Sequence, residues 1–156
     1  MSEAGARAMR LIFTKGSGKY DLLEITRAGS APQRIECPKQ GIIPHDMVHY
    51  AVESTVAARG FLRRVEGGES AGFRMDAKAD SDAVERLVEV FQGDAWSGGT
   101  SSADDMLGMY RVTCAARDCP VLPVDAATIL AVRDTIKRLG GEWDAIAVGG
   151  SLELFL

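Results

Sequence analysis

The spacing of apolar residues changes at Pro44, and this change constrains the fold more than any other feature of the sequence. Before Pro44, short apolar-rich segments over residues 9–14 and 20–27 and an alternation of polar and apolar residues over 33–37 are separated by glycine- and proline-containing turns, which predicts three short β-strands. After Pro44 the apolar residues recur about every 3.6 positions, as in helices buried on one face. Alternation returns over residues 151–156, which predicts a final strand.

Between these strands the sequence predicts about four helices. The first covers residues 44–59 and ends before Gly60, and the second covers residues 82–91. The third and fourth begin at the capping residues Ser102 and Asp125. A shorter helical turn is expected at residues 61–68. We therefore predict an α+β domain, in which an N-terminal antiparallel β-meander is joined by the C-terminal strand and the helices pack against the sheet.

Length and composition are those of one folded domain. The chain has 156 residues, of which 46% are hydrophobic and 26% charged, so it is too rich in apolar residues for a disordered chain. Residues 1–8 are small and polar, and we expect them to form a loose tail before a domain that spans residues 9–156. An odd number of cysteines, three, without a signal peptide indicates free thiols and a cytoplasmic protein.

The charges argue against two classes of partner. The net charge is −4, with a small basic excess in residues 1–43 and an acidic excess afterwards. The basic residues do not cluster, so we expect no nucleic-acid partner, and no apolar run is long enough to cross a membrane. Lys19 follows a glycine-rich segment but precedes a strand rather than a helix, which favours a hairpin turn over a phosphate loop. The sequence leaves open a homo-oligomer, a protein partner and a small-molecule ligand.

The two histidines of the chain lie four residues apart, at His45 and His49, near the start of the first predicted helix. On a helix they share one side with Glu53, and Asp46 borders the same sector. Two imidazoles at this spacing bind Zn²⁺ or a similar divalent metal in the His-Glu-x-x-His helix. One hypothesis therefore makes His45, His49 and Glu53 metal ligands, with Asp46 beside a metal-bound water. Another makes the same four residues a metal-free, hydrolase-like site with a histidine as general base.

A structural role explains the same residues. Pro44 suits the first position of a helix, and the negative charge of Asp46 in the first turn is stabilised by the positive N-terminal end of the helix. If Asp46 is instead the N-cap, His45 lies outside the helix and the i, i+4 geometry is lost. His49, beside an apolar arc, would then form a hydrogen bond in the core. Under this alternative the chain is a non-enzymatic interaction or regulatory module.

Other polar and sulfur-containing residues are predicted to be structural. Glu85 and Glu89 lie opposite the apolar stripe of the second helix, so we expect them on a solvated face. Cys114 and Cys119 do not have the two-residue separation of a zinc or redox pair, and we interpret them as structural thiols.

The histidine segment resembles a family of bacterial proteins of about this length, whose shared segment reads His-Asp-Leu-x-His-Tyr-x-Val-Glu. The matching residues are His45, Asp46, His49, Tyr50, Val52 and Glu53. Met47 stands where the pattern has Leu, and the similarity extends to the opening strands and to the final Gly-x-Leu-Glu-Leu strand. The resemblance implies that the segment works as a unit, and it implies no particular activity or cofactor.

Overall fold

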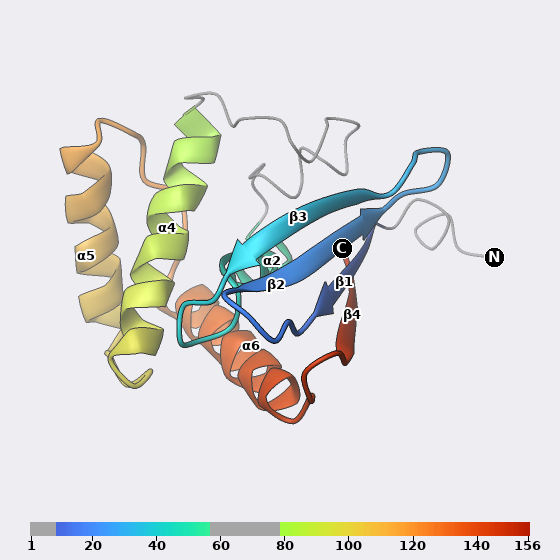
Figure 1. Ribbon diagram of the computed structural model, residues 1–156. Helices are drawn as coiled ribbons and strands as arrows, with labels where there is room; N and C mark the ends of the chain where they lie inside the picture. Colours follow the sequence, from blue (N-terminus) through green and yellow to red (C-terminus); the bar gives the residue numbers. More distant parts are fainter. Residues whose placement is uncertain (1–8, 57–78) are drawn as a thin grey trace.

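A four-stranded antiparallel sheet with the order β3-β2-β1-β4 forms one layer of the computed structural model, which describes residues 9–56 and 79–156 (Figure 1). Its strands are β1 (Arg10–Thr14), β2 (Tyr20–Thr26), β3 (Gln33–Pro38) and β4 (Ser151–Phe155). Strand β1 is central because it pairs with β2 on one side and with β4 on the other. The predicted meander, joined by the C-terminal strand, is therefore confirmed.

The described part of the chain contains the helices α2 (His45–Glu53), α4 (Ala79–Trp96), α5 (Ala103–Ala116) and α6 (Ala126–Asp144). Helix α2 contacts α4, α6 and β3, and α5 contacts α4 and α6 (Figure 1). Alternate residues of the strands turn toward these helices, so that the inward side chains of Leu11, Phe13 and Leu23 are fully buried. The predicted α+β class is thereby confirmed.

Capping residues set two of the helix starts as predicted. The Ser102 side chain accepts a hydrogen bond from the Asp105 N–H at 3.0 Å, and Asp125 accepts one from the Thr128 N–H at 2.8 Å. These bonds satisfy N–H groups that have no partner within the first turn of a helix.

The predicted bounds of the first two helices were wrong. Helix α2 ends at Glu53 rather than at residue 59, and residues 54–56 form a turn. Helix α4 starts at Ala79 and continues through Gly93 to Trp96, because a glycine costs a helix only about 1 kcal/mol, which packing offsets. The predicted tail at residues 1–8 and helical turn at residues 61–68 lie outside the described residues. No helix in the described ranges could cross a membrane.

Candidate metal centre

Helix α2 places both histidines on the side that faces α4. Pro44 is the N-cap, with an extended backbone (φ −55°, ψ 149°), and His45 is the first helical residue. The alternative with Asp46 as N-cap is therefore wrong, and the i, i+4 geometry is present. The centroids of the His45 and His49 rings lie 4.8 Å apart. Because Ile43 and Met47 are buried beside them, the start of α2 is fixed against the core.

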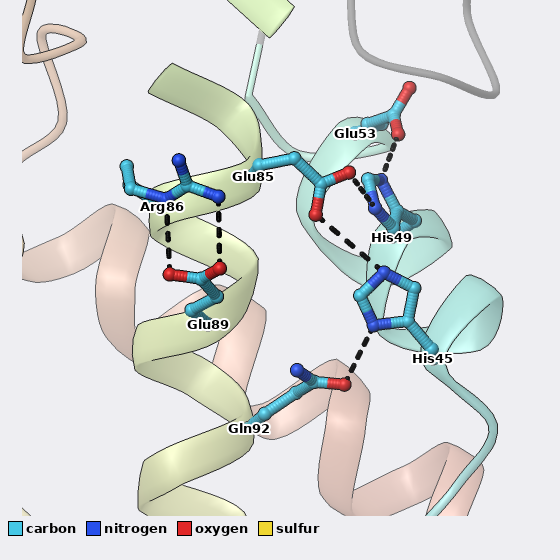
Figure 2. A network of polar contacts seen from close by, with 7 residues as sticks. All are labelled: His45, His49, Glu53, Glu85, Arg86, Glu89 and Gln92. Atoms are coloured by element: carbon cyan, nitrogen blue, oxygen red, sulfur yellow. Dashed lines mark hydrogen bonds and ion pairs between the residues drawn. The ribbon is translucent and has the colours of Figure 1, made fainter. Parts of the chain in front are cut away.

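Glu85 on α4 reaches across to both imidazoles (Figure 2). Its Oε2 lies 2.9 Å from His49 Nε2, and its Oε1 lies 3.6 Å from His45 Nε2. One ligand atom from each of the three residues lies within 4.8 Å of the others. The trio, His45, His49 and Glu85, could therefore hold a metal ion.

Both Glu85 and Glu89 were expected on a solvated face. This expectation was wrong for Glu85 and right for Glu89. The Glu85 side chain is only 25% exposed. Glu89 points away from the histidines and pairs with Arg86 of the same helix (Figure 2). Helix α4 packs against α5 as well as α2, so it buries more of its circumference than the single apolar stripe indicated.

The other nitrogen of each imidazole is bonded to an acceptor. His49 Nδ1 lies 2.7 Å from Glu53 Oε2, and His45 Nδ1 lies 2.8 Å from Gln92 Oε1 (Figure 2). Since carboxylate and amide oxygens accept hydrogen bonds, each Nδ1 carries a hydrogen and is the donor of its bond. Both Nε2 atoms are thus the nitrogens turned toward Glu85. Hydrogen bonds of this kind fix the orientation of metal-binding histidines.

In the metal-free cluster the carboxylates favour charged imidazoles. Burial opposes a charge on His49, but hydrogen bonds to Glu53 and Glu85 outweigh it and raise the pKa of His49 to about 10. Burial also opposes a charge on His45, and the bond to Glu85 raises its pKa above the usual value. For Glu85, burial is outweighed by the two histidines, which hold its pKa far below the usual range. A metal ion at this position would therefore replace protons.

Asp46 and Glu53 do not point into the space between the three residues of the trio. Asp46 Oδ2 lies 3.6 Å from the Sγ of Cys37 on β3, so its carboxylate faces the sheet. Glu53 is fully buried and contacts the Nδ1 edge of His49, whereas Glu85 contacts the Nε2 edge. Of the four site residues expected from the sequence, the structure thus brings His45 and His49 together with Glu85 and places Glu53 behind His49.

Sequence reasoning missed Glu85 and Gln92. They lie seven residues apart on α4, which places them on one side of that helix two turns apart. This spacing was the available signal, but nothing in the sequence indicated that α4 would lie beside the histidines. Gln92 is buried although polar, and its bond to His45 accounts for that position.

Comparisons of the chain with protein-family models, with curated proteins and with solved structures found no match.

Proposed function

We propose that the chain binds a divalent metal ion, zinc in the first place, through His45, His49 and Glu85. The observation that carries this proposal is the convergence of both Nε2 atoms and the Glu85 carboxylate. Each Nδ1 atom is hydrogen-bonded to a side-chain oxygen, which fixes the ring orientation. Two imidazoles and one carboxylate are a common protein ligand set for catalytic zinc. Glu85 takes the place that the sequence suggested for Glu53, which here orients His49.

The three ligand atoms, which lie within 4.8 Å of one another, would have to move closer together to bind such an ion. With Zn–N bonds of about 2.0–2.1 Å, ligand atoms at the corners of a tetrahedron lie about 3.4 Å apart. Glu85 Oε2 lies 2.9 Å from His49 Nε2 and Glu85 Oε1 lies 3.6 Å from His45 Nε2, so one carboxylate oxygen is already near each imidazole. His45 has a side chain that is 39% exposed, which gives an ion an approach from solvent.

Three protein ligands leave one tetrahedral position for water, whose pKa zinc lowers to about 7. Hydrolysis by this water is the activity that such a centre supports best. Asp46, which contacts Cys37, is not placed to accept its proton. The proposal also includes a cytoplasmic location and no nucleic-acid partner.

Zinc binding by the purified, metal-free protein tests the proposal. Calorimetric titration should show one zinc per chain, and Glu85→Gln should weaken binding by at least about tenfold because a neutral amide is a poor zinc ligand. The matched control is Glu89→Gln, one turn further along α4, which should bind like the original chain. Binding far below one zinc per chain, or equal binding by both variants, would contradict the proposal.

The alternative is a structural ion-pair network in an interaction or regulatory module. Its supporting observation is that His49 is 1% exposed and already has a carboxylate at each nitrogen. Under this alternative Glu85→Gln lowers the free energy of unfolding, and zinc does not change that energy for the original chain. If zinc instead raises the melting temperature of the original chain but not that of Glu85→Gln, the metal centre is favoured.

A further inference from the structure

A cavity of about 420 Å³ lies among the β1–β2 turn, the β3–α2 connection, the end of α4 and one side of α6. Neither histidine nor Glu85 lines it, so it is distinct from the metal centre. Buried apolar side chains contribute to its wall, among them Ile43, Phe91 and Trp143. A concave, partly aromatic site of this size is typical of those that bind small molecules.

Two of the acidic residues in the wall are already neutralised. Asp21 pairs with Lys39 and also accepts a hydrogen bond from the Gly16 N–H at 2.9 Å. Asp94 pairs with Arg133 at 3.2 Å and accepts a bond from the Ser101 N–H at 3.0 Å. These carboxylates are fixed by their partners and have little attraction left for a cationic ligand.

Two ammonium groups of the wall remain without a carboxylate partner among the described residues. Lys15 Nζ donates to the Trp143 carbonyl oxygen at 2.6 Å and lies 4.9 Å from the centroid of the Trp143 ring. Lys137 forms no ion pair with any described residue, and its stem lies over Gly99, where a Cβ would come within 3.3 Å of Lys137 Cε. Because Gly99 also has φ +73°, a glycine both forms this turn and leaves room for the lysine.

We propose that the cavity binds a small aromatic carboxylate, with the carboxylate near Lys15 and Lys137 and the ring against the apolar wall. The lining carries four basic residues and three acidic ones, an excess of one positive charge in a chain whose net charge is −4. The third acid, Asp144, has no ion-pair partner in the described ranges. It favours a monoanion over a phosphate of higher charge.

Ligand titrations followed by NMR test this proposal with the full chain and three probes of one shape. Indole-3-acetate should shift the backbone amide signals of Gly98, Gly99 and Gly140, which line the cavity. Indole-3-acetamide and tryptamine, which replace the negative charge by a neutral amide and a positive amine, should bind at least about tenfold more weakly. Equal binding of the acetate and the amide, or shifts confined to other residues, would overturn the proposal.

A substitution of Lys137 on α6 tests where the carboxylate binds. Lys137→Gln should weaken indole-3-acetate binding by about tenfold, the size expected for losing one charged hydrogen bond. The matched control is Arg138→Gln, because Arg138 pairs with Glu142 on the surface and does not line the cavity. Both side chains are exposed, so neither change endangers the fold. Equal affinities for Lys137→Gln and the original chain would refute the carboxylate's placement, whatever the outcome of the zinc titration.

Discussion

Glu53 and Glu85 contact opposite edges of the His49 ring, and the two carboxylates act on that ring in different ways. Glu53 is fully buried and accepts a hydrogen bond from the Nδ1–H, so it holds the ring in place whether or not an ion is bound. Glu85 faces Nε2, the atom that either carries a second proton or binds a metal. A proton and a metal ion would therefore compete for this nitrogen, and metal binding would release the proton.

At this scale Gln92 is the residue whose role in orientation is easiest to isolate. Gln92→Leu keeps a buried side chain of similar size but removes the acceptor for His45 Nδ1. We expect zinc affinity to fall by about 10- to 100-fold, as for other partners that orient metal ligands. Competition with a coloured chelator measures this change. An unchanged affinity with an intact fold would show that the bond to Gln92 does not position His45.

The thiol of Cys37 should be unreactive at mildly alkaline pH. Burial raises its pKa, and the nearby Asp46 carboxylate raises it further, so the nucleophilic thiolate is scarce at pH 8. Cys114 is also buried, and burial together with Cys119 raises its pKa to about 11. We expect iodoacetamide to modify the partly exposed Cys119 first, as read by mass spectrometry of peptides. Faster modification of Cys37 would show that β3 and α2 separate readily.

At the scale of elements, the pairing of α2 with α4 brings the candidate centre together. The sequence predicted what depends on neighbouring residues: the strand alternation, the caps at Ser102 and Asp125, and the His45–His49 spacing. It failed for Glu85, because burial of a polar residue on one helix depends on which distant helix packs beside it. The predicted bounds of α4 were wrong for a related reason, because tertiary packing stabilises the helix beyond Gly93.

The cap of α5 provides a test at this scale. Ser102→Ala removes the acceptor for the Asp105 N–H and should lower the free energy of unfolding by about 1 kcal/mol. Thr100→Ala, at an exposed position outside the helices, should change it by less than about 0.5 kcal/mol. Urea denaturation of the three proteins gives both values. Equal stabilities would mean that solvent replaces the lost acceptor at no cost.

For the whole molecule, the sheet is completed by segments from the two ends of the described chain. Residues 9 and 156 exchange two backbone hydrogen bonds, from the Met9 N–H at 3.1 Å and from the Leu156 N–H at 2.9 Å. Between them, Leu11 of β1 lies opposite Leu154 of β4, and both side chains are buried. The helical layer and the sheet therefore share a core that depends on β4.

Substitutions at neighbouring positions of β4 should separate its inner face from its outer one. Leu154→Ala should lower the free energy of unfolding by about 2–3 kcal/mol, because it leaves a cavity under β1. Phe155→Ala, on the exposed face opposite Arg10, should lower it by less than about 1 kcal/mol. Thermal or urea unfolding measures both. Similar losses from the two variants would contradict the assignment of these faces.

The pairing of β1 with β4 also closes a chain loop that contains every other described element. The entropy of closing a loop grows with its length, so this pairing is the most demanding contact of the sheet to form from an unfolded chain. Because residues 9 and 156 are hydrogen-bonded neighbours, a short peptide could join residue 156 to residue 9 in a variant that lacks residues 1–8. In such a cyclised chain the two segments are already joined in the unfolded state, so the unfolded state has less conformational entropy to lose on folding. The cyclised chain should therefore refold faster and melt at a higher temperature than the linear chain.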